Sequence, residues 1–451
     1  MPSGEDRRSL PLFAAIWRWH FYAGIFFTPF LVMLAVTGGI YLFKPQIESV
    51  LYKDLFFVSE GKKLETPSQQ IDRVKSSFPD AEIIRYKLPL EANRTSEVGL
   101  VTAEGESRTL FVNPYNGKVV GQLKDDQRLM DQIEQLHGEL MAGTIGDRLV
   151  ELAACWAMIL LITGAYLWWP RHRKGIFGTF LPRLKQGKRA FWRDLHAVPA
   201  FWLSLFIAFL ILTGLPWSGF WGEQLQKIGT ATQTGYPASL WGGDKPESTI
   251  PAKDVADVPW AAEQQPVPRS KATLASPLSI DQVVNIADSR GIHPGYNVTF
   301  PEGAKGVYTV SVFPDKSVDE ATMHIDQYSG KVLGDYRFRD YGPLAKIIAT
   351  GITLHKGTHY GLPNQIAGLL VCLGIVGIAI TGIVMWWKRK PSGNRLGAPP
   401  LPKNFRMVKG VGILVAVLGI LFPLAGCSLL LVLLLDRLVI RKIPRMKQWL
   451  G

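Results

Sequence analysis

The sequence predicts an α-helical integral membrane protein with an internal two-fold repeat. We expect a four-span core bundle, a C-terminal apolar hairpin or fifth span, and two α+β domains in the periplasm. Three observations predict this fold class. Of the 451 residues, 47% are apolar and only 19% are charged, the apolar residues gather in long runs, and motif spacings recur in the two halves of the chain. The composition excludes a cytosolic enzyme, a secreted disulfide scaffold and a disordered chain.

Four apolar runs are long enough to span a membrane, since a helix needs about 20 apolar residues to cross a hydrocarbon layer of roughly 30 Å. They cover residues 21–43, 149–169, 201–220 and 366–387. The first run is too long for the core of a signal peptide, and no A-x-A type cleavage site follows Phe43. We therefore interpret it as an uncleaved anchor.

Basic residues flank these runs and predict the topology. The formal net charge is +13, but the basic residues lie in loops beside the membrane and not on a face that would bind nucleic acid. By the positive-inside rule, the two basic loops and the N-terminus are cytoplasmic, so the long connections 44–148 and 221–365 lie on the opposite side. This predicts a multi-pass protein of the bacterial inner membrane with periplasmic connections. The loop residues are Arg171, Arg173, Lys174, Arg183, Lys185, Lys188, Arg189 and Arg193, then Lys388, Arg389, Lys390, Arg395, Lys403, Arg406 and Lys409.

A fifth apolar run, 411–435, contains Pro423 and has basic residues on both sides. A break at 423–426 would give a short hairpin that keeps both basic flanks in the cytoplasm, whereas a single crossing would place the second flank outside. We favour the hairpin and keep a fifth span as the alternative.

The expected order of the chain is N-terminus and span 1 (1–43), periplasmic domain 1 (44–147), span 2 (148–170), cytoplasmic loop (171–196), span 3 (197–221), periplasmic domain 2 (222–350), span 4 (351–388), cytoplasmic loop (389–410) and C-terminal segment (411–451).

The pair Thr-Gly occurs once in each of the four spans and reveals the repeat. Two offsets from a histidine to the threonine of such a pair, of 17 and 26 residues, each occur twice. In spans two and four, Trp-Trp follows the threonine after five residues. So many matched spacings indicate that the second half repeats the first. The offset of 17 joins His20 to Thr37 and His196 to Thr213, and that of 26 joins His137 to Thr163 and His355 to Thr381.

The periplasmic connections repeat as well. Residues 111–121 read FVNPYNGKVVG, and residues 324–334 read HIDQYSGKVLG. The pairs Asn116-Gly117 and Ser329-Gly330 predict hairpin turns between strands, since glycine tolerates a positive φ. Each connection is expected to be a small α+β domain with one amphipathic helix against a short antiparallel sheet.

Other local signals complete the periplasmic domains. Ser68 and Ser279 precede the two amphipathic segments and are the expected N-caps of their helices. The stretch 235–277 is rich in Pro, Ser, Thr and Ala, which favours an irregular loop or linker.

Four histidines follow the repeat and are candidate cofactor ligands, because ionisable side chains at membrane depth are costly and are most often functional. At 1.5 Å per residue, the two offsets correspond to roughly 25 and 39 Å of helix, so the histidines lie near the two ends of the bundle. The repeat pairs His20 with His196 at the cytoplasmic end and His137 with His355 at the periplasmic end. Two imidazoles from facing helices hold the iron of a b-type haem, so we expect two haem b groups. Covalent attachment is excluded because the chain has no Cys-x-x-Cys-His.

Several alternatives remain at these positions. Another metal, or an interfacial or core role, would also account for the histidines, although zinc would lack a carboxylate or thiolate to complete its site. His359 is the alternative to His355, as a ligand or a substrate contact. We keep His355 because Leu354-His355 aligns with Leu136-His137. His172 is expected at headgroups or in solvent, and His293 and His324 are expected to be structural. Neighbouring glycines would admit a flat macrocycle or another helix; they are Gly24, Gly38, Gly164, Gly214, Gly374, Gly377 and Gly382.

The turn motif 116–121 and its partner resemble PepSY domains. Their position between spans that carry Thr-Gly and Trp-Trp resembles the PepSY-associated transmembrane proteins of bacterial inner membranes, and the resemblance covers nearly the whole chain. It implies iron-linked reduction, since members are similar to ferric-siderophore (ferrioxamine) reductases that carry haem in the membrane. The implied function is to pass electrons across the membrane to a periplasmic ferric siderophore and release Fe(II), without a catalytic acid–base residue.

Two other functions remain open. The PepSY-like domains would suit a protein that binds or senses peptides or a periplasmic partner, and the histidines would suit a cytochrome b relay to a partner protein. The electron donor is expected to be a quinol or a separate protein, because the sequence has no Gly-x-Gly-x-x-Gly fingerprint after a strand and no cysteine set for an iron–sulfur cluster.

Overall fold

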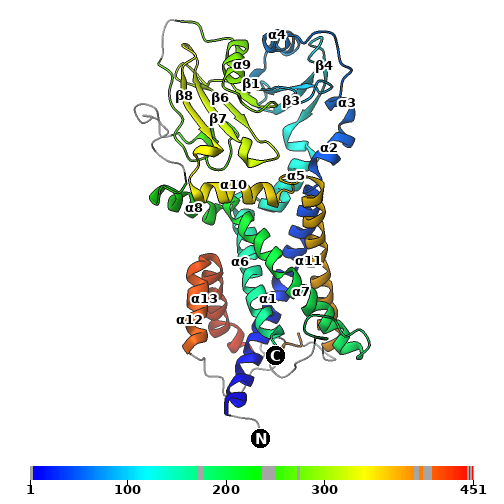
Figure 1. Ribbon diagram of the computed structural model, residues 1–451. Helices are drawn as coiled ribbons and strands as arrows, with labels where there is room; N and C mark the ends of the chain where they lie inside the picture. Colours follow the sequence, from blue (N-terminus) through cyan, green and yellow to red (C-terminus); the bar gives the residue numbers. More distant parts are fainter. Residues whose placement is uncertain are drawn as a thin grey trace. The chain divides into compact units, whose positions relative to one another are not determined.

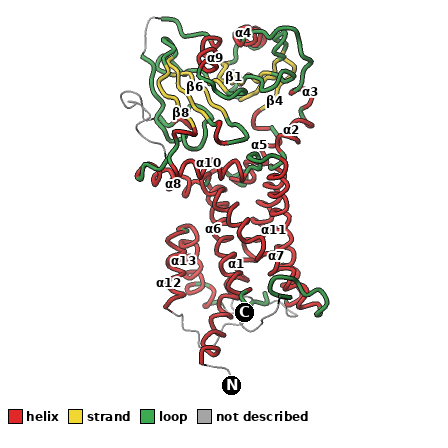
Figure 2. The backbone as a smooth tube through the Cα atoms, viewed as in Figure 1, coloured by secondary structure: helices red, strands yellow, loops and turns green. Residues whose placement is uncertain are grey.

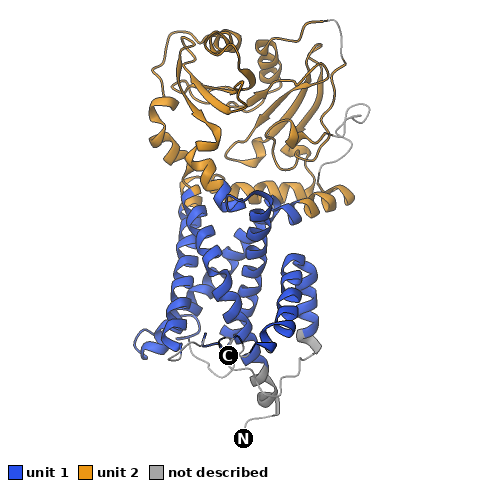
Figure 3. Ribbon diagram, turned by 180° about the vertical axis from the view of Figure 1, so that it is seen from behind, with its two compact units in different colours: residues 1–40, 135–222, 366–451 blue, residues 41–134, 223–365 orange. Residues whose placement is uncertain are grey.

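The computed structural model describes residues 4–170, 176–235, 250–271, 275–390, 396–399, 409–443, 446 and 449. The chain divides into two compact units, drawn in blue and orange in Figure 3. Residues 1–40, 135–222 and 366–451 form a helical unit, and residues 41–134 and 223–365 form a unit that contains the sheet. The residues of interest that lie outside the described part are His172, Arg171, Arg173, Lys174, Arg395, Lys403 and Arg406.

Four long apolar helices make the core of the helical unit (Figure 1). They are α1 (Gly4–Tyr41), α6 (Gly143–Trp168), α7 (Lys188–Gly214) and α11 (Leu362–Arg389). Each contains a stretch long and apolar enough to cross a membrane, so the four predicted spans are confirmed as candidate spans. Helix α7 begins well before the apolar run that predicted it, because Lys and Arg are good helix formers and do not end a helix.

The third span ends earlier than predicted. Helix α7 stops at Gly214, residues Leu215–Trp217 form a short 3-10 helix, and a new helix, α8 (Gly219–Ala231), follows. Asp147 and Glu151 of α6 accept hydrogen bonds of 3.0–3.1 Å from the backbone N–H groups of the first three residues of α8. Carboxylates at this end satisfy unpaired donors and oppose the positive end of the helix dipole. The apolar run 201–220 therefore contains the start of a second helix.

The fifth apolar run folds into two short helices, α12 (Lys409–Leu421) and α13 (Pro423–Leu438), joined at Phe422. The two helices lie side by side (Figure 1). They approach closely where Gly419 meets Gly426: a Cβ on Gly426 would lie 2.6 Å from the carbonyl oxygen of Gly419. Each arm is shorter than the roughly 20 residues that a span needs. The described residues thus have the hairpin at this place, and not a single fifth helix.

The second unit is built on one eight-stranded antiparallel sheet, shown in yellow in Figure 2, with the order β4-β3-β2-β1-β5-β6-β7-β8. Two four-stranded meanders meet where β1 pairs with β5. The expectation of two separate sheets is therefore wrong. Each of these strands would be an exposed edge of its own meander, and their pairing satisfies backbone groups that an edge leaves open. The strands are β1 (Glu82–Lys87), β2 (Ser96–Val101), β3 (Ser107–Val112), β4 (Val119–Lys124), β5 (Asn297–Thr299), β6 (Val307–Val312), β7 (Ala321–Asp326) and β8 (Val332–Arg337).

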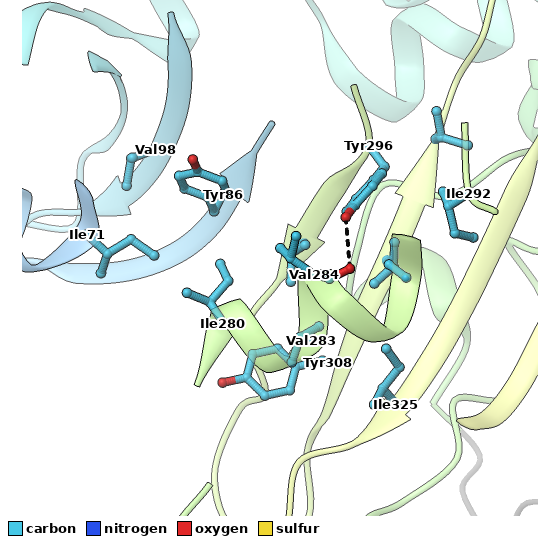
Figure 4. Packing of buried hydrophobic residues seen from close by; sticks show 14 of the residues in the cluster. Ile71, Tyr86, Val98, Ile280, Val283, Val284, Ile292, Tyr296, Tyr308 and Ile325 are labelled. Carbon is cyan, nitrogen blue, oxygen red and sulfur yellow. Dashed lines mark hydrogen bonds between the residues drawn. The ribbon is translucent and has the colours of Figure 1, made fainter. Parts of the chain in front are cut away.

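One hydrophobic core serves both halves of the sheet. Helices α4 (Pro67–Ser77) and α9 (Ile280–Ser289) place apolar side chains in the same cluster, together with strands of both meanders. Figure 4 shows Ile71 of α4 near Tyr86 and Ile280. Because the buried area is shared, neither half has a complete core alone.

The other α-helices of the described residues are α2 (Lys44–Leu51), α3 (Lys53–Phe56), α5 (Leu129–Glu139) and α10 (Pro343–His355).

The N-caps of α4 and α9 follow the same chemistry at different positions. Ser279 caps α9 as predicted, in a capping box with Gln282. Helix α4 is capped by Thr66 and not by Ser68, in a box with Gln69. Pro67 occupies the first helical position, where proline is favoured because its missing N–H would be unpaired anyway, so the cap moves to the residue before it.

Both predicted hairpin turns are confirmed. Gly117 has φ 64° between β3 and β4, and Gly330 has φ 71° between β7 and β8, a conformation that strains other L residues. The residue before each glycine tightens its turn: the Lys118 N–H donates to Asn116 Oδ1 at 3.0 Å, and the Lys331 N–H donates to Ser329 Oγ at 3.3 Å. The repeated motif thus encodes one turn geometry twice.

The stretch predicted as a loose linker is irregular but packed. Residues 236–249 and 272–274 lie outside the described part of the chain. In the part between them, Ala252 and Ala262 are fully buried in a cluster with Val307 of β6. Trp260 is 5% exposed and packs in a cluster with Tyr336 and residues of α10. This segment therefore belongs to the core of the second unit.

Candidate functional site: histidines seated on Thr-Gly pairs

His20 on α1 and His196 on α7 lie together within the helical unit. Their ring centroids are 6.5 Å apart and their planes are inclined at 84°. Both side chains are half-buried. The predicted pairing of these two histidines is therefore present in the structure as a close approach of two imidazole rings from different helices.

His20 is seated on the Thr-Gly pair of α6. Its Nδ1 lies 2.9 Å from Thr163 Oγ1. A Cβ on Gly164 would lie 3.3 Å from Cε1 of the same ring, which is closer than an ordinary van der Waals contact. The threonine thus binds the imidazole and the glycine leaves room for it.

His196 is seated in the same way on the Thr-Gly pair of α11. Its Nδ1 lies 2.9 Å from the carbonyl oxygen of Ile378 and 3.4 Å from Thr381 Oγ1. A Cβ on Gly382 would lie 3.3 Å from Cε1 of the ring. Here the shorter hydrogen bond goes to the backbone.

His137, at the end of α5, is seated on the Thr-Gly pair of α1. Its Nδ1 lies 2.8 Å from Thr37 Oγ1, and a Cβ on Gly38 would lie 3.1 Å from Cε1. The arrangement therefore occurs three times within the helical unit, with a different helix supplying the Thr-Gly pair each time. Thr213-Gly214 is the remaining Thr-Gly pair of the four spans, and His355 stays the predicted fourth ligand.

The hydrogen bonds around these threonines determine the tautomer of the histidines. A hydroxyl has one hydrogen, and in all three pairs it donates to the carbonyl four residues earlier, at 2.8 Å. While the Thr163 and Thr37 hydroxyls keep these helical bonds, they accept from Nδ1, and the Ile378 carbonyl that binds His196 can only accept. This arrangement places the proton of each neutral histidine on Nδ1, which leaves a lone pair on Nε2, the nitrogen available to a metal.

A buried ion pair anchors the start of α7 near His196. Arg183 Nε lies 2.7 Å from Asp194 Oδ2, and a second bond of 3.0 Å joins the Arg183 guanidinium to Oδ1. Asp194 is 1% exposed and is two residues from His196. Such a bidentate pair fixes direction as well as distance, so it helps to hold the helix that presents the imidazole.

His355 and His359 belong to the sheet-containing unit. His355 is the last residue of α10. His359 does not continue the helix that carries His355, because α10 ends at His355 and Gly357 has φ 78°. The His359 Nδ1 lies 3.0 Å from Thr353 Oγ1. The choice between the two as a ligand stays a prediction.

The 26-residue offsets do not measure a continuous helix. Helix α5 ends at Glu139 and α6 begins at Gly143, and Leu140 and Met141 between them have positive φ. Helices α10 and α11 are likewise separate. The expected length of roughly 39 Å is therefore too long.

His324 and His293 lie in the sheet-containing unit. His324 on β7 is fully buried, with its Nδ1 3.0 Å from Thr309 Oγ1 and its ring against that of Tyr336. The Nδ1 of His293 is 2.8 Å from the carbonyl oxygen of Pro294. Both placements are consistent with the structural roles expected for them.

Protonation of His324 is expected to destabilise the second unit at acid pH. Burial lowers its pKa to about 4, so the unfolded chain takes up this proton near pH 6.5 while the folded chain does not. The stability contribution is complete above pH 6.5 and falls between pH 6.5 and 4, by up to about 3 kcal/mol. The variant His324→Asn should lose less stability over this interval in detergent-based unfolding measurements. An identical pH dependence in the variant would show that other groups control it.

The sequence indicates the four Thr-Gly pairs but not their role. The repeated offset relates a threonine to a histidine along the chain, for example Thr37 to His20 on the same helix. The structure joins His20 to Thr163 and His137 to Thr37. The threonine that lies 17 residues after His20 therefore binds a different histidine, His137. A signal was available, since a threonine followed by a glycine is suited to bind a ring and to leave space for it.

Comparison with known proteins agrees with this architecture. The family model of the PepSY-associated TM region matches residues 17–389, a range that includes every histidine and Thr-Gly pair described above. A comparison with curated proteins found no match. The chain is a multi-pass membrane protein, and it belongs to the family of the PepSY-associated TM region.

Proposed function

We propose that this protein is a di-haem b oxidoreductase of the bacterial inner membrane that reduces ferric siderophores on the periplasmic side and releases Fe(II). The observation that carries the proposal is the pair His20 and His196, which come from two spanning helices and are both held in the tautomer with Nδ1 protonated. The N-terminus and both basic loops would be cytoplasmic, as the charge pattern predicts.

The residues of this pair fit a haem with two histidine ligands. Two imidazoles that bind opposite sides of one metal ion, through nitrogens about 2 Å from it, have centroids roughly 6 Å apart, and these centroids are 6.5 Å apart. The described residues contain no group of three or more His, Cys, Asp or Glu side chains placed to hold a metal ion. Two imidazoles without a third described protein ligand would suit haem iron better than a tetrahedral zinc site.

The second haem of the proposal would be held by His137 and, by the repeat, His355, with His359 as the alternative. His137 supports this because its Nδ1 is bound by Thr37 as that of His20 is by Thr163. The same seat at two places predicts the same ligand chemistry at both.

Haem, when bound, would supply one-electron transfer. The chain's own contribution would be to hold the iron through Nε2 of the histidines and to orient their rings through Nδ1. Gly164 and Gly382 leave space for the two rings. Holding these groups among apolar spanning helices also limits the access of water.

The proposed substrate suits reduction without acid–base chemistry. A siderophore binds Fe(III) through hard oxygen donors, which hold Fe(II) far less firmly. One electron from a quinol or a donor protein converts Fe(III) to Fe(II), and the metal then leaves the chelate. We propose that the sheet-containing unit, which the topology predicts on the periplasmic side, meets the ferric siderophore.

The proposal is tested by mixing dithionite-reduced purified protein anaerobically with a ferric hydroxamate in the presence of a ferrous chelator. We expect the haem spectrum to become oxidised while the ferrous complex forms, with one Fe(II) for each haem oxidised. Haem that stays reduced with every ferric chelate but is oxidised by a partner protein would support the cytochrome relay instead. Protein that contains no haem would support the binding or sensing function.

A further inference from the structure

The three seated histidines differ in what accepts the Nδ1–H hydrogen bond, and this difference has a chemical consequence. His20 and His137 donate to a threonine hydroxyl, at 2.9 and 2.8 Å. His196 donates mainly to the carbonyl of Ile378, and Thr381 is further away, at 3.4 Å. The same Thr-Gly motif therefore holds one histidine through a side chain and its proposed partner through the backbone.

We infer that Thr163 is a positioning residue that sets the reduction potential of the haem shared by His20 and His196. The inference rests on the proposed function, because it requires that His20 ligates haem iron. It extends that function by assigning a role to the threonine of the motif, which does not contact the iron itself.

The physical basis is the basicity of the ligand nitrogen. An imidazole that donates a hydrogen bond from Nδ1 becomes a stronger electron donor through Nε2. A stronger donor stabilises Fe(III) more than Fe(II), and second-shell hydrogen bonds of this kind are among the factors that set haem potentials. Loss of the acceptor should therefore raise the reduction potential.

Thr163 is well placed to act in this way because its hydroxyl is itself fixed. It donates to the carbonyl of Ile159 at 2.8 Å, so its lone pair is directed to the His20 ring. Gly164, the next residue, lets the ring approach. The hydroxyl cannot reverse the bond without giving up its own helical acceptor, which keeps His20 in the tautomer that binds metal.

The test compares three variants of the purified full-length protein by spectroelectrochemical titration and haem determination. Thr163→Val has nearly the same shape but no acceptor, and Thr163→Ser restores the hydroxyl. Thr381→Val is the comparison at the partner histidine, because His196 keeps its shorter bond to the Ile378 carbonyl when the 3.4 Å contact with Thr381 is lost. For Thr163→Val we expect two haems and a higher potential for one of them. The expected change is about tenfold in the ratio of reduced to oxidised haem at a fixed potential, which is about 59 mV for a one-electron couple.

The serine variant should titrate close to the wild type. Thr381→Val should raise the potential less than Thr163→Val does, because the shorter bond from His196 to the Ile378 carbonyl remains. Equal shifts in the serine and valine variants of Thr163 would overturn the inference, since they would point to packing and not to the hydrogen bond. An unchanged potential in Thr163→Val, with two haems present, would overturn it while leaving the proposed function intact. Wild-type protein without haem would overturn both. Loss of one haem in the valine variant alone, with the serine variant intact, would support the role of the hydroxyl in holding His20.

Discussion

Replacing His196 with alanine is expected to reduce the haem content of the purified protein from two haems per chain to one. The proposed haem would be held only by two protein nitrogens, because the chain has no Cys-x-x-Cys-His for covalent attachment. Removal of one of these ligands would leave the group weakly bound. The same result is expected for His20→Ala, because both rings belong to one pair. Haem extraction into acidic acetone, together with iron analysis, measures the loss.

The controls for this prediction are histidines in other surroundings. His293→Ala should keep both haems, since its Nδ1 lies beside the carbonyl of Pro294 within the sheet-containing unit. His172→Ala is expected to do the same. Wild-type protein that yields zinc and no haem would exclude the ligand assignment as a whole. At the other pair, a haem lost in His359→Ala but kept in His355→Ala would exchange the roles of these two residues.

Apolar runs and charge allowed the helical part of the fold to be predicted, because the cost of burying a polar backbone in lipid leaves few alternatives. The hairpin near Pro423 was also expected, since proline cannot continue a helix without losing a hydrogen bond. The limits of α7 and α8 were not. Their boundary depends on Asp147 and Glu151, which cap α8 from another helix, and a contact of this kind has no local signal.

The joined sheet was not predictable from the repeat. Two copies of a helix and a meander, as in Pro67–Lys124 and Ile280–Arg337, suggest two domains when each copy is considered alone. Whether β1 and β5 pair with each other depends on the register of two distant strands and on the shared core that surrounds Tyr86 and Tyr296. Both are long-range properties of the folded chain.

The histidines proposed as ligands could be predicted from the sequence. The Thr-Gly pairs that they contact could not. Equal offsets identified His20, His196, His137 and His355 because a repeat conserves distance along the chain. The offsets could not show that the histidine of one helix binds the threonine of another, since that depends on helix packing. The structure supplies this link for His20, His196 and His137.

Valine in place of Gly382 is expected to remove the haem that we propose for His196, and this is the second large effect that we expect. A Cβ at this position would lie 3.3 Å from Cε1 and 3.5 Å from Nδ1 of His196, so alanine would press on the ring and the two further methyl groups of valine would displace it. Overpacking of this kind typically costs about 1–3 kcal/mol, and here the displaced group is the proposed ligand. We expect alanine to weaken haem binding and valine to reduce the content from two haems to one.

Gly377→Val is the matched control for this prediction. Gly377 lies on the same helix, α11, five residues before Gly382, and the variant makes the same change from glycine to valine. Apart from its chain neighbours and the nearby backbone of its own helix, no described atom lies within 4 Å of a Cβ at Gly377, so the variant should keep two haems. If both valine variants lose one haem, the effect comes from glycine's place in the helix and not from the seat of His196. If neither does, the ring does not need the space that Gly382 leaves, and the close approach of the imidazole to the Thr-Gly pair is not what positions the ligand.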